Sequence, residues 1–472
     1  MSAETIYQHL LRNLPYTPTP DQEILLQLIA QHLFRKTPRK LFILKGYAGT
    51  GKTTAVAALV KTVAQSSLKT VLMAPTGRAA KVLSSYTGEK ALTIHRKIYR
   101  VRLSGKSGPA VIRARNMHRN TLFIVDEASM IGGENATQDS FFSRRNLLDD
   151  LIDYVYSGNN CQLLLVGDSA QLPPVGSDQS PALNINYLKA RYHLNINSFE
   201  LKQVVRQEAE SAILKLATEI RNRLYQNRQF SIPRVTGPEI GYITGEELQE
   251  ILSDSLNTTQ PPECVVITRS NKRANLFNEA IRQRILFREN EIGAGDILMV
   301  VKNNYFWLDE NDPMGFIANG DLAEVRKVIR THELYGFRFA QVVIEFPDFP
   351  DTGQIETVIM LDTLTIEQPS LGQEQYREFY EAVKEDYADL LPAKQAEEVR
   401  KNRWFNALQV KFAWSLTCHK TQGGQWPVVI IDPGYLRKEH LDESWLRWLY
   451  TAVTRATDKL FILNFPEWVF DA

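Results

Sequence analysis

With 472 residues, the chain is too long for one ordinary hydrophobic core, because domains average about 150 residues, so about two to four packed domains are expected. An apolar fraction of 44% beside 23% charged residues excludes an intrinsically disordered chain. A formal net charge of only +1 gives no argument from overall charge for a nucleic-acid partner.

The amino terminus shows no basic segment followed by an apolar run, and no stretch reaches the roughly 18 uninterrupted apolar residues of a membrane span. We therefore expect a cytoplasmic protein without a membrane partner. Cys161, Cys264 and Cys418 are far apart and lack the spacing of metal ligands. Each is expected to be a small buried residue, with neither a disulfide framework nor a zinc site.

The first strong signal is a strand, a glycine-rich loop and a helix in succession. The apolar run Leu41–Leu44 leads into Gly46-x4-Gly51-Lys52-Thr53, and a helix is expected from Thr53 to Gln65. In this context the pattern predicts a loop that binds ATP phosphates, rather than a structural glycine turn. The predicted nucleotide-binding residues are Gly46, Gly49, Thr50, Gly51, Lys52, Thr53 and Thr54. Lys52 is expected to reach the phosphates, and the Thr53 hydroxyl to bind Mg²⁺.

Further short apolar runs predict strands separated by helices, which favours parallel sheets covered on both faces. These runs are Val71–Ala74, Leu122–Val125, Leu163–Val166, Val265–Ile267, Val428–Ile431 and Leu460–Leu463. They are too scattered for one sheet, so we expect two α/β lobes.

A basic segment interrupts the first lobe. Its cations, without an acidic residue among them, are Arg96, Lys97, Arg100, Arg102, Lys106, Arg113, Arg115 and Arg119. Alternating residues around Gly105 and Gly108 predict a basic β-hairpin over about 96–119. A merely solvated charged hairpin is the alternative reading.

Two acidic residues follow the apolar run Leu122–Val125. A strand end beside a phosphate-binding loop is where Mg²⁺ and the attacking water must be held, so Asp126 is expected to bind the metal and Glu127 to activate water. Gln171 lies in a proline-stiffened turn after the run Leu163–Val166 and is placed to sense the γ-phosphate. A solvated strand end and an ordinary turn residue are the alternatives.

Short alternating runs between residues 293 and 361, at Ile297–Val301, Leu322–Val328 and Gln341–Phe346, predict a small β-barrel. From Glu374 to Arg403 the composition favours a projecting helical segment. Trp307 and Phe306 could stack on bases, although aromatic residues of a small barrel more often belong to its core.

These motifs, taken together, resemble superfamily 1 helicases of the 5′→3′ branch, the RecD-like and Dda-like group. The resemblance also rests on Thr19-x-x-Gln22, Ala74-Pro-Thr-Gly-Arg-Ala-Ala-Lys81, Thr93-Ile-His95-Arg96, Leu201-x-x-Val204-Val-Arg206-Gln207, Thr417-Cys-His-Lys-Thr-Gln-Gly423 and Leu449-Tyr-Thr-Ala-Val-Thr-Arg455-Ala456. Their order and spacing follow the family over most of the chain. One departure is Gln425, at a place where many relatives have a glutamate that contacts the nucleotide sugar.

The resemblance implies roles for residues outside the first strand, loop and helix. Gln22 would read adenine, and Arg206 and Arg455 would reach the γ-phosphate from the second lobe. It also implies a track for single-stranded nucleic acid, lined by Pro75, Thr76, Arg78, His95, Arg96, His419, Lys420 and Thr421. The basic hairpin would be the pin that separates strands.

The expected fold is therefore α/β, with two RecA-like P-loop domains, an inserted hairpin and an SH3-like barrel with a helical arm. We place the first motor domain at 1–200, the second at 201–292 and 405–472, and the barrel and arm at 293–404. The expected function is an ATP- and Mg²⁺-dependent DNA helicase that moves 5′→3′ as a monomer on single strands and at junctions with duplex. A translocase that strips proteins or acts on RNA, and a nucleotide-gated scaffold, are the alternatives.

Overall fold

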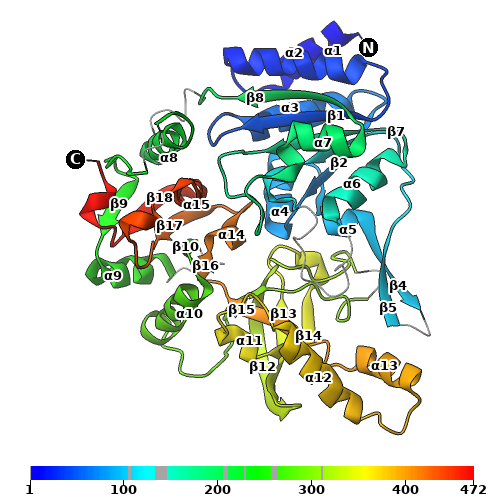
Figure 1. Cartoon of the computed structure of the whole chain (residues 1–472), viewed down its shortest axis with the longest axis vertical. Helices are drawn as coiled ribbons and strands as arrows, with labels where there is room; N and C mark the ends of the chain where they lie inside the picture. Colours follow the sequence, from blue (N-terminus) through cyan, green and yellow to red (C-terminus); the bar gives the residue numbers. More distant parts are fainter. Residues whose placement is uncertain are drawn as a thin grey trace.

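The computed structural model of the chain describes residues 2–104, 108–132, 146–205, 211–227, 230–256, 263–309 and 312–471. It contains two parallel sheets, a closed barrel and a two-stranded hairpin (Figure 1). The predicted fold class is thereby confirmed. Within the described residues, no helix is both long enough and apolar enough to span a membrane.

The first motor domain is built on a six-stranded sheet in the order β3-β2-β6-β7-β1-β8, with every neighbouring pair parallel. Its strands are β1 (Lys40–Gly46), β2 (Lys69–Ala74), β3 (Ala91–Thr93), β6 (Arg119–Val125), β7 (Asn159–Gly167) and β8 (Asn195–Leu201). Its helices are α1 (Ala3–Asn13), α2 (Pro20–Phe34), α3 (Lys52–Ala64), α4 (Gly77–Thr87), α5 (Ile94–Ile98), α6 (Leu147–Tyr156) and α7 (Ile185–Tyr192).

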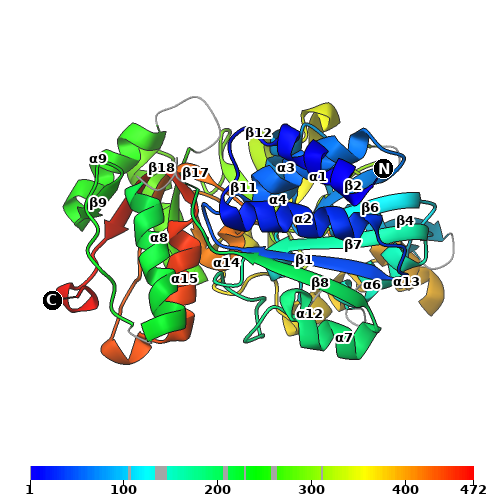
Figure 2. The same ribbon diagram turned by 90° about the horizontal axis from the view of Figure 1, so that it is seen from above.

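Both faces of this sheet are covered, as its continuous apolar strands require. Phe42 and Leu44 of β1 pack with α1, α2 and α3, whereas Leu41 and Ile43 pack in the core beneath α6 and α7. Figure 2 shows these two sets of helices on opposite sides of the sheet. The carboxyl ends of the strands therefore open at one edge, which faces the second motor domain.

The second motor domain has a five-stranded sheet in the order β16-β10-β17-β18-β9, again with parallel neighbours. The strands are β9 (Ile240–Ile243), β10 (Cys264–Thr268), β16 (Ser415–Thr417), β17 (Trp426–Ile431) and β18 (Ala456–Leu463). The helices are α8 (Ala212–Asn222), α9 (Gly245–Leu256), α10 (Asn271–Ala280), α14 (Cys418–Thr421) and α15 (Glu443–Val453). All three cysteines are buried and free, as expected.

The barrel closes through β11 (Ile297–Val300), β12 (Leu322–Leu334), β13 (Phe337–Glu345), β14 (Gln354–Met360) and β15 (Leu408–Phe412). The boundary predicted at residue 405 precedes β15, which pairs with both β11 and β14. We therefore propose that the barrel unit extends to Phe412. After α11 (Asp362–Thr365), the helical arm consists of α12 (Gln373–Glu385) and α13 (Pro392–Lys401).

The predicted basic hairpin forms, but it is shorter than residues 96–119. Strands β4 (Tyr99–Ser104) and β5 (Gly108–Arg113) pair antiparallel from Tyr99 with Arg113 to Ser104 with Gly108. Arg96 and Lys97 belong to α5 instead, since the Thr93 side chain caps that helix by accepting from the Arg96 N–H. The tip at 105–107 lies outside the described residues.

The aromatic pair Phe306 and Trp307 lies between β11 and β12 and is half-buried. Trp307 packs partly buried against the barrel, and its Nε1 donates to the Asn406 carbonyl at 2.8 Å. The Phe306 and Trp307 rings meet edge to face, with 5.0 Å between their centroids. These contacts support the core interpretation over base stacking.

Candidate nucleotide site and strand track

The glycine-rich loop is shaped by backbone that few other residues could adopt. Gly49 and Gly51 have φ angles of 70° and 80°, in the left-handed region, and α3 begins at Lys52 directly afterwards. The Lys52 ammonium donates to the Tyr47 carbonyl at 2.8 Å, and the Thr50 hydroxyl donates to the same oxygen at 2.8 Å. The loop therefore presents a lysine, hydroxyls and backbone N–H groups at a helix amino end, which suits phosphate.

Gln22 lies beside this loop, but both ends of its amide already have partners. Its Oε1 accepts from the Thr19 N–H at 3.0 Å in a capping box, and its Nε2 donates to the Thr50 carbonyl at 3.2 Å. An added Cβ on Gly51 would lie 2.4 Å from that Nε2. Gln22 is thus packed against the loop, and reading adenine would require its amide to change partners.

Asp126 and Glu127 follow β6 at the same sheet edge. The Asp126 Oδ1 accepts from the Glu127 N–H at 2.9 Å. Burial raises the pKa of Asp126 to about 7, and the charge of Glu127 adds to the rise, against the opposing effects of that hydrogen bond and of Lys52. Glu127 has a φ of 51°, which turns the chain sharply into the short 3-10 helix Ala128–Met130.

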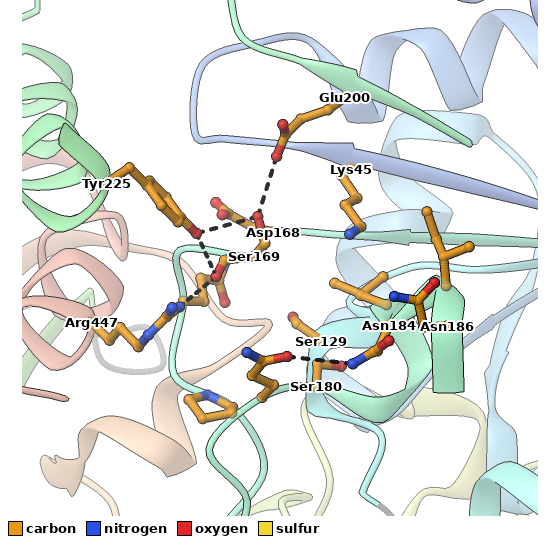
Figure 3. Close-up of a pocket in the computed structure, with 15 residues that line it drawn as sticks. Lys45, Ser129, Asp168, Ser169, Ser180, Asn184, Asn186, Glu200, Tyr225 and Arg447 are labelled. Atoms are coloured by element: carbon orange, nitrogen blue, oxygen red, sulfur yellow. Dashed lines mark hydrogen bonds between the residues drawn. The ribbon is translucent and has the colours of Figure 1, made fainter. Parts of the chain in front are cut away.

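A cavity of about 560 Å³ opens beside the loop, lined by side chains from both motor domains (Figure 3). Lys45, Asp168 and Glu200 come from the first domain, and Tyr225 and Arg447 come from the second. Lys52 and Thr53 are not among its lining residues, so the cavity adjoins the phosphate loop rather than enclosing it.

Two buried polar atoms at this cavity have no hydrogen-bond partner among the described residues. They are the Oε1 of Gln171, which is 6% exposed, and the Oγ of Ser129. Such atoms are costly unless something pairs with them during the working cycle. The predicted sensor Gln171 therefore retains bonding capacity at the boundary of the two domains.

The domains are joined across this edge by hydrogen bonds that the sequence did not predict. The Tyr450 hydroxyl accepts from the Ala48 N–H at 2.9 Å and donates to Asp168 Oδ2 at 2.7 Å. Burial raises the pKa of Tyr450 well above its usual range, so the hydroxyl keeps the proton that it donates. The Thr451 hydroxyl also accepts from the Leu172 N–H at 2.8 Å. Tyr450 and Thr451 lie in the motif from Leu449 to Ala456, and membership in that motif is the only sequence feature that points to a role for them.

Replacing Tyr450 by phenylalanine is expected to tighten nucleotide binding about threefold to tenfold, because a loop N–H then becomes free for a phosphate oxygen. Titration with a fluorescent ATP analogue measures this change. Tyr242→Phe serves as a control, since that hydroxyl donates to Val235 inside the second domain. Unchanged or weaker binding in Tyr450→Phe would show that its hydroxyl does not compete with phosphate.

Arg455 is buried at 4% exposure and is bound to backbone of its own domain. Its guanidinium donates to the carbonyls of Thr451 and Gly424 at 3.0 and 3.2 Å. The structure therefore holds Arg455 within the second domain and does not direct it at the phosphate loop. Arg206 lies outside the described residues.

The predicted strand-track residues divide into two groups. Pro75, Thr76 and Arg78 lie at the amino end of α4, and His419 and Lys420 lie at the second domain's α14. Arg78 joins the two, because it donates to the Gln425 carbonyl at 3.0 Å and stacks over the Trp426 ring at 3.7 Å. That contact uses the backbone of Gln425, the position at which the family pattern departs.

Two residues predicted for the track are buried in protein contacts instead. Arg96 forms an ion pair with Asp321 at 2.9 Å, donates to the Phe316 carbonyl at 3.1 Å and stacks over Phe349 at 4.2 Å. It therefore connects the first domain to the barrel. The hydroxyl of Thr421 donates to the Cys418 carbonyl, and this residue is fully buried. Burial also lowers the pKa of His95 to about 4, which leaves its ring neutral.

The basic character of the hairpin is likewise reduced by acidic neighbours. Arg113 bonds to Asp150 and Asp153 on α6 at 3.2 and 2.8 Å. The charge of Arg113 is therefore compensated by two carboxylates of the first domain, whereas Arg100 bonds only to the neutral carbonyls of Arg96 and Tyr99.

Two segments of the chain match known families. Residues 25–228 match a family described as an AAA domain, and residues 412–463 match the UvrD-like helicase C-terminal domain. The first match contains the phosphate loop and the acidic pair, and the second contains the segments from α14 to Arg455. The two matched segments therefore supply residues on both sides of the boundary where Tyr450 bonds to Ala48 and Asp168.

Individual proteins are similar over longer ranges. The ATP-dependent RecD2 DNA helicase of Deinococcus radiodurans is 25% identical over 435 residues, covering 89% of this chain and 46% of that protein. The ATP-dependent DNA helicase dda of Enterobacteria phage T4 is 25% identical over 276 residues, covering 54% of this chain and 55% of that protein. The chain thus spans about half the length of these two helicases. A solved Pif1 helicase from Bacteroides has a TM-score of 0.46 at 16% identity, covering 97% of this chain and 95% of that one.

The domain matches and the two helicases confirm the predicted resemblance to superfamily 1. They match the segments that carry the motifs on which that resemblance was based.

Proposed function

We infer that the chain is a superfamily 1 helicase of the 5′→3′ branch, which hydrolyses ATP between its two motor domains and separates DNA strands. The observation that carries this proposal is the direct bonding of Tyr450, on α15 of the second domain, to the phosphate loop and to Asp168 of the first. A ligand on the loop must rearrange these bonds, so nucleotide binding and the relation between the domains are physically linked.

The residues at the loop fit ATP with Mg²⁺. Asp126 is a half-buried carboxylate whose charge Lys52 stabilises, and the Thr53 hydroxyl lies in the first turn of α3. Mg²⁺ is commonly held by one or two carboxylates together with substrate phosphates. Asp126 and the phosphates of ATP would therefore be enough to hold the metal. The metal would neutralise phosphate charge, while Lys52 holds the phosphates and Glu127 accepts a proton from the attacking water.

Hydrolysis is coupled to movement through the loop that contains Asp168, Gln171 and Leu172. The amide Nε2 of Gln171 donates to the γ-phosphate, while its free Oε1 accepts from the attacking water, and Arg455 leaves its backbone acceptors to complete the site. When the phosphate departs, Tyr450 and Thr451 bond to the first domain again. The α14 and α4 segments thus change their separation with each cycle and move a bound strand.

The proposed strand contacts include Lys420, a lysine whose surroundings lower its pKa. Burial lowers the pKa of Lys420 to about 8, and the buried Lys411 nearby has its own pKa lowered to about 7 by burial and by Lys420. Neither lysine forms an ion pair with a carboxylate of the described residues. A strand phosphate beside Lys420 would supply the missing negative charge.

Affinity for single-stranded DNA is therefore expected to fall about threefold to tenfold as the pH rises from about 7 to about 9 at constant salt. The sign follows because the strand binds the charged lysine, while Lys420 of the free protein loses its proton above about pH 8. Fluorescence anisotropy with a labelled oligonucleotide measures the change, and Lys420→Met should flatten the profile. A decline that persists in Lys420→Met would assign the pH dependence to another group.

The hairpin β4–β5 is the proposed pin, and its removal tests helicase against translocase. Deleting Ser104–Pro109 should reduce strand separation far more than DNA-stimulated ATP hydrolysis. Equal unwinding before and after the deletion would show that this hairpin is not the pin. DNA-stimulated ATP hydrolysis without strand separation by the intact chain would favour a translocase. Absence of stimulation by single-stranded DNA or RNA in the intact chain would instead favour a nucleotide-gated scaffold.

A further inference from the structure

A second cavity lies at the opposite edge of the first sheet, where β1, β6 and β7 begin. Its volume is about 860 Å³, and it is lined by the carboxyl end of α2, the segment 35–40, the end of α3 and the loop 66–68. Because the nucleotide cleft lies at the carboxyl ends of the same strands, an occupant here would leave that cleft open. We call this cavity the rear groove.

The floor of the rear groove is apolar and its rim is cationic. We call the buried and half-buried apolar lining, Leu33, Val63 and Leu68, the floor, and the charged lining the rim. Phe34 is also a lining residue, with 55% of its surface exposed. Arg35, Lys36, Arg39 and Lys40 are the charged residues among the lining, which includes no Asp or Glu. An exposed aromatic ring within a one-sign electrostatic field is typical of an interaction surface.

The cations of the rim are not all needed by the fold. The buried Lys40 ammonium caps the carboxyl end of α2, because it donates to the carbonyls of His32, Leu33 and Arg35 at 2.7, 3.3 and 2.5 Å. Arg35 and Lys36 are exposed and have no carboxylate partner among the described residues. Their charge is therefore available to a ligand.

Arg39 is exposed but held in place. It donates to the Tyr192 carbonyl at 3.2 Å, and its guanidinium lies 5.1 Å from the centre of the Tyr156 ring. A rigid cation costs little entropy when it binds an anion. The rim thus combines a fixed cation with the two free ones.

A further polar atom in the groove distinguishes between classes of ligand. Gln162 is 6% exposed, and its Oε1 has no partner among the described residues. This oxygen needs a donor, which a peptide N–H supplies and a phosphodiester does not. Carboxylates for the rim, an apolar side chain for the floor and an N–H for Gln162 are together provided by an acidic peptide.

We propose that the rear groove binds an acidic segment of a partner protein that carries a bulky apolar side chain. The acidic side chains pair with Arg35, Lys36 and Arg39, and the apolar one packs on Leu33 and Phe34. A partner held in this way stays attached while the nucleotide cleft and the strand track operate. The proposal stands apart from the helicase assignment, since it uses none of the same residues.

The test uses the full chain and a fluorescein-labelled peptide that alternates aspartate and phenylalanine, followed by anisotropy. We expect saturable binding that weakens with salt and falls at least about tenfold in Lys36→Glu and in Phe34→Ser. Lys215→Glu, the same charge change at an exposed residue of α8, is the matched control and should bind as the parent does.

Two further peptides and a DNA probe complete the test. Replacing the aspartates by asparagine, or the phenylalanines by alanine, should each abolish binding. Equal binding of the uncharged peptide, or an unchanged affinity in Lys36→Glu, would overturn the proposal. So would a loss in Lys36→Glu that affects a blunt DNA duplex and not the peptide, since the groove would then serve DNA.

Discussion

Replacement of Lys52 by alanine is expected to lower the rate of ATP hydrolysis at least about a thousandfold. In the structure its ammonium bonds to the Tyr47 carbonyl at 2.8 Å, which holds it directly over the loop whose N–H groups would bind phosphate. A phosphate oxygen can replace that carbonyl as acceptor with little movement. Alanine removes the only cation on this loop and also a charge that lowers the pKa of Asp126.

The measurement is steady-state ATP turnover with saturating single-stranded DNA. Lys61→Ala is the control, since that exposed lysine lies in the last turn of the same helix, and it should retain the parent rate. Circular dichroism should show both variants folded. Retained hydrolysis in folded Lys52→Ala would contradict the assignment of this loop as the catalytic phosphate site.

Glu127→Gln is expected to reduce turnover by a similar factor while ATP still binds. The amide keeps the size of the side chain but cannot accept a proton from the attacking water. Because the charge of Glu127 contributes to the raised pKa of Asp126, the variant should ionise Asp126 more readily. Binding of ATP with Mg²⁺ should therefore remain as tight as in the parent, or become tighter.

Rapid mixing separates the two steps, with a fluorescent ATP analogue for binding and phosphate release for hydrolysis. Lost binding in Glu127→Gln would assign the residue to nucleotide or metal contact instead of water activation. Near-parent hydrolysis would remove it from the mechanism.

Several of the strands that the sequence failed to predict share physical features. β3 has only three residues, and β8 mixes Asn and Ser with its apolar residues because it lies at the edge of the sheet. β9 contains Gly241, where an added Cβ would lie 2.7 Å from the Phe461 ring. Short or edge strands carry weak patterns, whereas the central strands, buried on both faces, were all recognised.

The barrel shows a different limit of sequence reasoning. β15 is buried at every residue and was placed in a motor domain, because periodicity cannot reveal which sheet a buried strand joins. It includes Lys411, a buried cation that donates to the Ile366 carbonyl. Only the pairing with β11 and β14 decides its place.

At the candidate site, the local motifs were predictable and the long-range contacts were not. The loop at Gly46–Thr53 and the acidic pair carry their chemistry within a few residues. Arg96, in contrast, reads as a surface cation until Asp321, 225 positions away, is brought against it. The role of Tyr450 likewise becomes visible only in the structure, where α15 brings its hydroxyl to the N–H of Ala48 in the phosphate loop.

The proposed function rests on movement of the chain in one direction along single-stranded DNA, driven by closure between the two motor domains. Its most direct test is unwinding by the intact chain, with ATP and Mg²⁺, of matched DNA duplexes that carry either a 5′ or a 3′ tail, alongside RNA equivalents. We expect strand separation from the 5′-tailed DNA only. Unwinding confined to the 3′-tailed duplex, or no unwinding of any substrate despite DNA-stimulated ATP hydrolysis, would contradict it.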